Sequence, residues 1–142
     1  MLTRTELMAV LEDWTGAWAR HDLDGVMNSF HDDAVFEHWT GSTVRGKAAL
    51  REAWTSWFSD HGHFRFTDEA VVADEVTQTA LWRWSLEWPS HERGAAGARE
   101  VRRGVDVIRF EGGLLIEKLT YSKTAVQLDG RPVRLALPSS EA

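Results

Sequence analysis

The sequence contains no cysteine, which excludes disulfide bonds, thiol nucleophiles and thiolate metal sites. It also lacks a run of basic residues, and its formal net charge of −6 argues against a nucleic-acid-binding surface. Residues 1–14 hold no uninterrupted apolar segment, and no stretch of the chain approaches the length of a membrane span. We therefore expect a soluble, cytoplasmic protein that binds neither nucleic acid nor membrane.

Several motifs that hold cofactors or nucleophiles are also missing. The glycines fit no nucleotide-binding fingerprint, and no serine elbow is present. His61 and His63 alternate along the chain, but no third metal ligand follows at a recognisable spacing, and there is no HExxH-type motif. We therefore expect neither a metal ion nor a cofactor.

What the chain does have is tryptophan. It has 142 residues, 43% of them hydrophobic, and eight are tryptophan. That length suits a single domain with a substantial core, here residues 1–142, with an ordered part from about residue 3 to 124 and a carboxy-terminal extension after it. We expect residues 138–142 to be disordered. An indole buries a large apolar area and keeps one N–H, so this number of tryptophans favours an aromatic-lined cavity or an interface.

Apolar residues at helical spacing predict three helices. The first is capped by Thr5 and ends near His21. A shorter helix begins at Asp22 and continues through Phe30, followed by a turn at residues 32–33. The third follows Gly46 and ends at residues 60–62.

Between and after these helices the sequence predicts strands, over residues 34–39, 64–73, 76–88 and a hairpin across 99–123. The hairpin turns at Gly112-Gly113, residues 74–75 form another turn, and residues 89–97 form a mobile connection. A weaker segment after residue 123 turns at Asp129-Gly130. Together these predict an α+β fold, in which helices pack on one face of a strongly curved antiparallel sheet.

Asp106 lies in the middle of the most apolar strand. Alternation places it on one face with Gly104, Ile108 and Phe110, while Val105 and Val107 lie on the other. A carboxylate in such a strand loses its water and must find a partner, a proton or a ligand, so we interpret Asp106 as the anchor of a site. The alternative is a purely structural ion pair with a cation of the same sheet: Arg83, Arg102 or Lys118.

Lys118 interrupts the apolar run of residues 114–119 and shares a face with Ile116 and Thr120. It either enters the interior and pairs with Asp106 or lies exposed at a sheet edge.

Three stretches of the chain resemble the nuclear-transport-factor-2-like superfamily, in its SnoaL-like and ketosteroid-isomerase-like branch. These are DLDGV at 22–26, HDDAVFEHWTG at 31–41 followed by GKAAL at 46–50, and RGVDVIRFEGG with EKLTYSK over 103–123. The resemblance implies a cystatin-like α+β roll: a cone formed by a curved sheet and closed by amino-terminal helices, with a deep pocket at its wide end.

The comparison with ketosteroid isomerase implies roles for particular residues. Asp106 matches the oxyanion-hole aspartate, His38 occupies the position of the general base, and Trp14 stands where the oxyanion tyrosine would be. We therefore take His38, Asp106 and Lys118 as candidate catalytic residues. With Lys118 nearby, Asp106 is expected to be ionised and to orient His38, while the lysine takes the oxyanion. The alternative for His38 is a core histidine bonded to the backbone.

The candidate substrate-binding residues are tryptophans at helical or strand spacing, whose alternative role is plain core packing. They are Trp14, Trp18, Trp54 and Trp84, with Trp82 as the alternative to Trp84.

These expectations combine into a cofactor-independent enzyme that transfers a proton on an apolar, carbonyl-bearing polyketide-, terpenoid- or steroid-like molecule. The alternatives are a non-catalytic ligand-binding protein of the same fold, and an epoxide hydrolase or dehydratase. The hydrolase fits poorly, because alternation places Arg103 and Asp106 on opposite faces. Since both faces of the hairpin are apolar and helices cover only one, we also expect a homodimer through the sheet.

Overall fold

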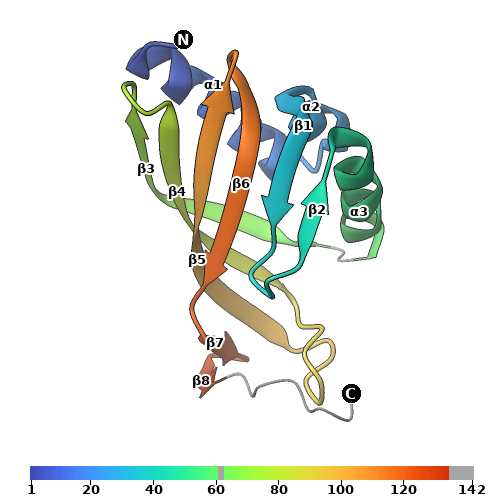
Figure 1. The fold of residues 1–142 in the computed structure, drawn as a ribbon. Helices are drawn as coiled ribbons and strands as arrows, with labels where there is room; N and C mark the ends of the chain where they lie inside the picture. Colours follow the sequence, from blue (N-terminus) through green and yellow to red (C-terminus); the bar gives the residue numbers. More distant parts are fainter. Residues whose placement is uncertain (61–62, 135–142) are drawn as a thin grey trace.

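The structure, a computed structural model, describes residues 1–60 and 63–134. Three helices pack against one face of a curved sheet whose strands run across the front of Figure 1. This is the predicted α+β class. None of the helices in these two segments is long and apolar enough to cross a membrane.

Helix α1 (Arg4–Ala19) is capped two residues earlier than expected, since Thr5 was the predicted cap. Its N-cap is Thr3, whose side chain accepts from the Glu6 backbone N–H in a capping box, so Thr5 lies inside the helix. The buried face repeats at helical spacing, through Leu7, Leu11, Trp14, Ala17 and Trp18.

The next two elements correct the expected boundary at residues 30–33. Helix α2 (Leu23–Asn28) is capped by Asp22 as predicted, but it ends before Phe30. Strand β1 (Phe30–Glu37) occupies the expected helix end and turn. Phe30 pairs with Leu115 in strand β6, so a contact with a distant strand overrides the local helical pattern. Asp32 and Asp33 are exposed positions in this strand.

The sequence did not predict the short strand before the third helix, but it did predict that helix. Strand β2 (Thr43–Arg45) pairs antiparallel with β1, and three residues are too few to give a period. Helix α3 (Lys47–Asp60) ends where predicted. The rest of its expected end, His61 and Gly62, lies outside the described residues.

The main sheet has the order β2-β1-β6-β5-β4-β3. Strands β3 (Arg65–Asp74), β4 (Thr79–Pro89), β5 (Arg99–Glu111) and β6 (Leu114–Ser122) form an antiparallel meander. Strand β1, however, pairs with β6 in parallel, so the sheet is mixed and not wholly antiparallel. No hairpin joins these two strands, because β2, α3, β3, β4 and β5 lie between them in the chain.

The two connections that flank β4 are held by hydrogen bonds. The β3–β4 turn spans residues 75–78, longer than expected, with Gln78 at φ 52° and its side chain bonded to Leu2. The connection between β4 and β5 is hydrogen-bonded across its base, where Ser90 N donates to Ala98 O at 2.7 Å.

The carboxy-terminal extension carries regular structure beyond residue 124. Strands β7 (Ala125–Leu128) and β8 (Arg131–Arg134) form a hairpin that turns at Asp129-Gly130, as predicted, and β7 pairs with the start of β5. Residues 138–142, expected to be disordered, lie outside the described part.

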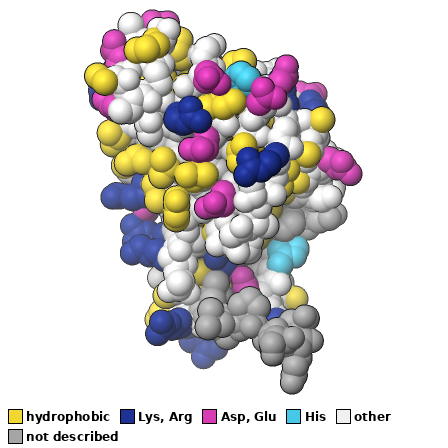
Figure 2. Space-filling view, viewed as in Figure 1, with side chains coloured by type: hydrophobic (Ala, Val, Ile, Leu, Met, Phe, Trp, Pro, Cys, Tyr) yellow, Lys and Arg dark blue, Asp and Glu magenta, His cyan; other side chains and the backbone are white. Residues whose placement is uncertain are grey.

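The alternation predicted for β5 is confirmed. Asp106, Ile108 and Phe110 are buried against the helices, while Val105 and Val107 lie half-buried on the opposite face. That outer face carries the exposed side chains of Val72, Leu81 and Tyr121. In Figures 1 and 2 it is turned toward the reader, with the helices behind it and hydrophobic side chains gathered over its strands.

Candidate active site

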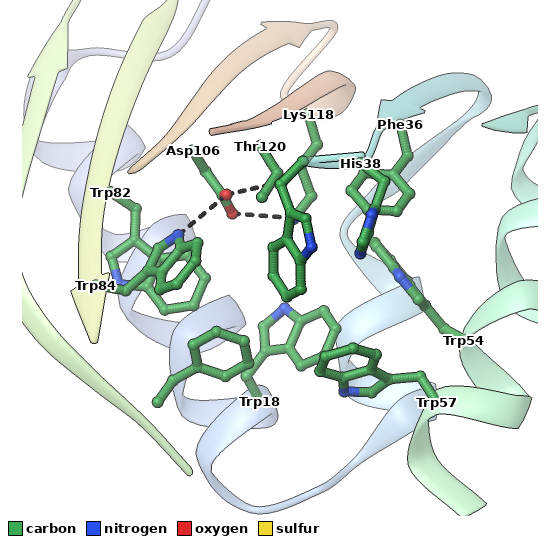
Figure 3. A pocket seen from close by; sticks show the side chains of 12 residues that line it. Trp18, Phe36, His38, Trp54, Trp57, Trp82, Trp84, Asp106, Lys118 and Thr120 are labelled. Atoms are coloured by element: carbon green, nitrogen blue, oxygen red, sulfur yellow. Dashed lines mark hydrogen bonds and ion pairs between the residues drawn. The ribbon is translucent and has the colours of Figure 1, made fainter. Parts of the chain in front are cut away.

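A pocket lies between the inner face of the sheet and helices α1 and α3 (Figure 3). Six of the eight tryptophans line it, and its polar groups come from β5, β6 and the end of β1. The lining residues are Trp18, Phe36, His38, Trp39, Trp54, Trp57, Phe66, Trp82, Trp84, Asp106, Lys118 and Thr120. The space left between these side chains is about 30 Å³, room for about one water molecule.

Asp106 is almost fully buried and is held by three groups. Its Oδ1 accepts from Thr120 Oγ1 at 2.8 Å and from Trp84 Nε1 at 3.1 Å. Its Oδ2 lies 3.1 Å from Lys118 Nζ. The strand register explains the arrangement, because Thr120 is the direct cross-strand partner of Asp106.

Gly104 makes the bond from Trp84 possible. It is the cross-strand partner of Trp84, and a Cβ added there would lie 2.6 Å from the Trp84 ring and 2.2 Å from the Tyr121 carbonyl oxygen. Without a Cβ, the indole lies across the strand and its N–H reaches Asp106 two residues further along β5.

The predicted pairing of Lys118 with Asp106 is confirmed. The alternative, an exposed lysine at a sheet edge, is wrong, because Lys118 is buried. Its ammonium donates to Thr120 Oγ1 at 2.7 Å and lies over the rings of Phe36 and Trp54, at 4.5 and 5.6 Å from their centroids. Burial lowers the pKa of Lys118 below its ordinary value of 10.5, and the Asp106 carboxylate partly opposes this effect.

The other cations considered for Asp106 lie elsewhere. Arg102 pairs with Glu92 and Glu100, and Arg83 contacts Glu69 on the outer face. Arg103, considered for the hydrolase alternative, contacts the same Glu69. The bidentate Arg103–Glu69 pair therefore faces away from Asp106, as the alternation predicted.

His38 lies immediately after β1 and not within it, but it does line the pocket. Its Nδ1 lies 3.1 Å from Thr40 Oγ1 and 3.3 Å from the Thr40 backbone N. The N–H of Thr40 can donate to an unprotonated Nδ1, and its hydroxyl can accept from a protonated one. Thr40 therefore accommodates both neutral tautomers of His38.

One expected link is wrong: Asp106 does not orient His38. Among the described residues, the carboxylate is bonded to Trp84, Thr120 and Lys118 and makes no bond with the imidazole. Oδ1 accepts two hydrogen bonds and Oδ2 forms the ion pair with Lys118, so Asp106 positions the lysine instead. His38 and Lys118 both lie near the ring of Phe36, the His38 ring at a centroid distance of 5.8 Å and Lys118 Nζ at 4.5 Å.

Of the predicted tryptophans, Trp18, Trp54 and Trp84 line the pocket, and so does Trp82. Trp14 does not. It lies in the core behind the lining, packed edge-on against Trp82 and Phe30 at centroid distances of 5.4 and 6.0 Å. It therefore contributes neither wall nor oxyanion donor.

The prediction missed the rim of the pocket. Trp39 and Trp57 are the half-buried tryptophans of the lining. Trp57 follows Trp54 by one helical turn, a spacing visible in the sequence. Nothing local marks Trp39, whose ring lies 6.2 Å from Trp57 and 4.3 Å from His38.

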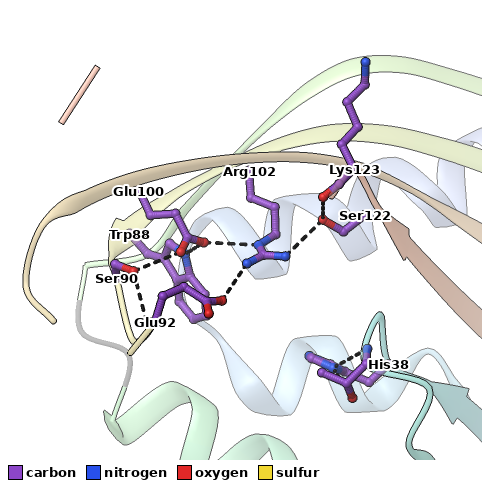
Figure 4. A network of polar contacts seen from close by, with 9 residues as sticks. His38, Trp88, Ser90, Glu92, Glu100, Arg102, Ser122 and Lys123 are labelled. Atoms are coloured by element: carbon purple, nitrogen blue, oxygen red, sulfur yellow. Dashed lines mark hydrogen bonds and ion pairs between the residues drawn. The ribbon is translucent and has the colours of Figure 1, made fainter. Parts of the chain in front are cut away.

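A second buried polar network adjoins this rim (Figure 4). Arg102 donates to Glu100 at 3.1 Å and to Glu92 at 2.9 Å, and its third contact is Ser122 Oγ at 3.2 Å. The guanidinium carbon also lies 4.6 Å from the Trp39 ring centroid. The network thereby joins the β4–β5 connection, the end of β6 and the pocket rim.

No three His, Asp or Glu side chains converge as metal ligands within residues 1–60 and 63–134.

Comparisons with known proteins agree with this fold. The SnoaL-like domain family matches residues 11–118. A protein of unknown function with a cystatin-like fold from Methylobium petroleophilum PM1 is 21% identical, with a TM-score of 0.69 over 99% of both chains. No curated protein gave a significant match.

Two further solved structures carry names that suggest activities. A protein from Xanthomonas campestris pv. campestris, provisionally named a polyketide cyclase, is 16% identical with a TM-score of 0.71, covering 84% of this chain and 92% of that one. SalBIII, an epoxide hydrolase/cyclase-like enzyme of pyran ring formation in salinomycin, is 15% identical with a TM-score of 0.74, covering 87% and 95%. Identities this low establish the fold alone. The family match spans most of the sequence, and the curved sheet, the helices and the pocket agree with it: the chain belongs to the SnoaL-like domain family.

Proposed function

We propose that this protein is a cofactor-independent enzyme that transfers a proton on an apolar, carbonyl-bearing ring compound of polyketide, terpenoid or steroid type. One observation carries the proposal: a buried lysine, held by Asp106 and Thr120, faces an aromatic pocket that also contains His38. A cation in such a pocket stabilises negative charge that develops on a carbonyl oxygen. An imidazole beside the same ring supplies the proton acceptor.

Each residue then has a separate task. Lys118 receives the oxygen of the enolate. Asp106 and Thr120 hold the ammonium in place, and His38 removes or returns the proton at carbon. This differs from an oxyanion hole built on a protonated aspartate, because Asp106 Oδ1 accepts two hydrogen bonds and Oδ2 faces the Lys118 ammonium.

The small cavity constrains how a ligand reaches this site. Sites for drug-sized ligands enclose about 300–1,000 Å³, well above the 30 Å³ left here. A ring-sized ligand therefore requires side chains of the lining to move, and Trp39 and Trp57 are the half-exposed candidates. The aromatic lining of the pocket also suits the second candidate function, a binding protein without turnover.

Neighbouring structures named as a polyketide cyclase and an epoxide hydrolase/cyclase-like enzyme support carbonyl or ring chemistry as a class. An epoxide hydrolase built on an Arg103–Asp106 pair is not supported, since Arg103 contacts Glu69 on the outer face.

The experiment has two steps. Native mass spectrometry of the purified protein identifies a co-purifying ligand, and cyclic ketones related to it are then incubated with the protein in D₂O. We expect deuterium at the carbon next to the carbonyl. His38→Gln is expected to fold and bind normally, but its exchange rate should fall by a factor of about 10²–10⁴.

His63→Gln is the matched control, because His63 is exposed and outside the pocket lining. Full exchange by a stable His38→Gln protein would remove His38 from the mechanism. Tight binding without any exchange by the wild type would favour the binding protein.

A further inference from the structure

The Lys118 ammonium has more donors than polar partners. It carries three N–H groups, and in the described part of the chain its polar contacts are Thr120 Oγ1 at 2.7 Å and Asp106 Oδ2 at 3.1 Å. Its remaining surroundings are the faces of Phe36 and Trp54. The nitrogen is thus held from one side by oxygen atoms and presented on the other side to an apolar cavity.

This setting favours a reactive amine. Lysine is a nucleophile only in its neutral form, and desolvation in an apolar pocket is one established way to make that form accessible. The direction of the Lys118 pKa shift agrees with the geometry, since burial lowers it. The carboxylate at 3.1 Å is close enough to take the proton that the amine must lose.

We propose that Lys118 forms a reversible imine with apolar aldehydes and ketones that enter the aromatic pocket, with Asp106 as the proton relay and the counter-ion of the product. This covalent activity goes beyond the proton transfer proposed above and does not require His38. The ligand class is a small, preferably aromatic or alicyclic carbonyl compound, because the cavity walls are mainly indole and phenyl rings.

The steps balance without any further reagent. The ammonium gives one proton to Asp106, and the neutral nitrogen attacks the carbonyl carbon to form a C–N bond. The carbonyl oxygen takes protons from the nitrogen and from Asp106 and leaves as water when the C=N bond forms. An ammonium and a carbonyl compound have become an iminium ion and water, so the charge beside Asp106 is unchanged.

This conserved charge is what the site is suited to stabilise. An iminium retains one N–H, which Asp106 Oδ2 can accept. In the adduct, the apolar part of the carbonyl compound packs against the rings that the ammonium faced before. The positive charge keeps Asp106 as its partner.

The chain provides internal controls for the test, because its only lysines are Lys47, Lys118 and Lys123. The full-length protein is incubated near pH 7 with benzaldehyde or acetaldehyde and sodium cyanoborohydride, which reduces iminium ions to stable amines. Peptide mapping by mass spectrometry then locates the alkyl group. We expect the first group on Lys118, at least about tenfold faster than on the exposed Lys123.

Three variants complete the experiment. Lys118→Arg keeps a cation beside Asp106 but removes the nucleophile, so labelling is expected only at Lys47, Lys123 and the amino terminus. Lys47→Arg and Lys123→Arg should leave the rate at Lys118 unchanged. Because the wild-type map reports Lys118 directly, the result does not depend on whether Lys118→Arg folds.

Labelling of Lys47 and Lys123 by both aldehydes, with Lys118 unlabelled in the folded wild type, would overturn the imine. Deuterium exchange that depends on His38 would in that case still support the proton-transfer function, so the failures of the two proposals are distinguishable.

Discussion

At the scale of single residues, the site depends on the absence of a side chain at Gly104. Trp84 donates to Asp106 only because its ring crosses Gly104, where a Cβ would lie 2.6 Å from the indole. The glycine has an ordinary negative φ, so close packing and not backbone freedom requires it here.

We predict that Gly104→Ala destabilises the protein by about 1–3 kcal/mol, the usual cost of overpacking a core, and weakens ligand binding because Trp84 is displaced. Urea unfolding measures the first effect. Gly16→Ala is the control: it lies within α1, where its Cβ would approach only the tip of the Arg20 side chain, and is expected to stabilise by up to about 1 kcal/mol. Equal stability of the Gly104→Ala and wild-type proteins would contradict this account of the packing.

Lys118 also leads to a prediction about pH. Its pKa in the folded protein is lowered from 10.5, so between the two values the unfolded chain binds the proton and the folded chain does not. The unfolding free energy therefore rises with pH across this window, and the gain is lost as the pH falls through the folded-state pKa.

Lys118→Met removes this titration. As the pH is raised from 7 toward 10.5, we expect the unfolding free energy of the wild type to rise relative to that of Lys118→Met, measured by urea unfolding. Lys123→Met, at an exposed position, is the control for the loss of a lysine. Parallel curves for wild type and Lys118→Met would show that burial does not shift the proton equilibrium of Lys118.

At the scale of elements, the β1–β2 turn places Trp39 in the lining of the pocket. The turn is closed by backbone bonds from His38 N to Ser42 O and from Gly41 N to His38 O. Between them Trp39 lies over the rim, with its ring against the Arg102 guanidinium. Arg102 is itself fixed to Glu100 and Glu92, so the network holds the indole in place.

We predict that Trp39→Leu raises the association rate of a fluorescent aromatic ligand, because a smaller side chain opens the rim and leaves the polar bonds of Arg102 intact. Stopped-flow fluorescence measures this rate. Loss of the stacking contact corresponds to about 0.5–2 kcal/mol, or roughly a 2- to 30-fold acceleration. Tyr121→Leu, on the outer face, should leave the rate unchanged. If both variants bind at the wild-type rate, Trp39 is not the barrier.

At the scale of the whole molecule, the outer face of the sheet is the notable feature. Val72, Leu81, Val107 and Leu119 form one cross-strand row over β3, β4, β5 and β6. Val72 and Leu81 are 54% and 42% exposed, and Tyr121 in the neighbouring row is 50% exposed. Figure 2 shows hydrophobic side chains gathered on this face. A contiguous apolar area of this kind favours an interface.

We propose a homodimer formed through this face, the arrangement expected from the two apolar faces of the hairpin. Sedimentation velocity at micromolar concentration should show a dimer for the wild type and a monomer for Leu81→Arg, which places a charge in the row. Val76→Arg is the control, because Val76 is 83% exposed but lies in the β3–β4 turn. A monomeric wild type would refute the interface.

Much of this fold follows from local pattern. Alternation along residues 104–110 identified the inward face of β5, and glycines at 112–113 identified the hairpin that brings Lys118 near Asp106. These features have a period of two or lie within one turn, so neighbouring residues are sufficient to specify them. The α+β class and the Lys118–Asp106 pair were predictable for this reason.

Other features were decided by tertiary structure. The parallel pairing of β1 with β6, the position of Trp14 behind the lining and the contact of Arg102 with Trp39 each join segments far apart in the chain. An apolar stripe on a helix shows that Trp14 and Trp18 face the core, but not which of them reaches the cavity, because that depends on where Trp82 and Phe66 lie across from them. The sequence by itself determined which side chains turn inward. Only the packing of the helices against the curved sheet decided which of those side chains fill the core and which surround the site.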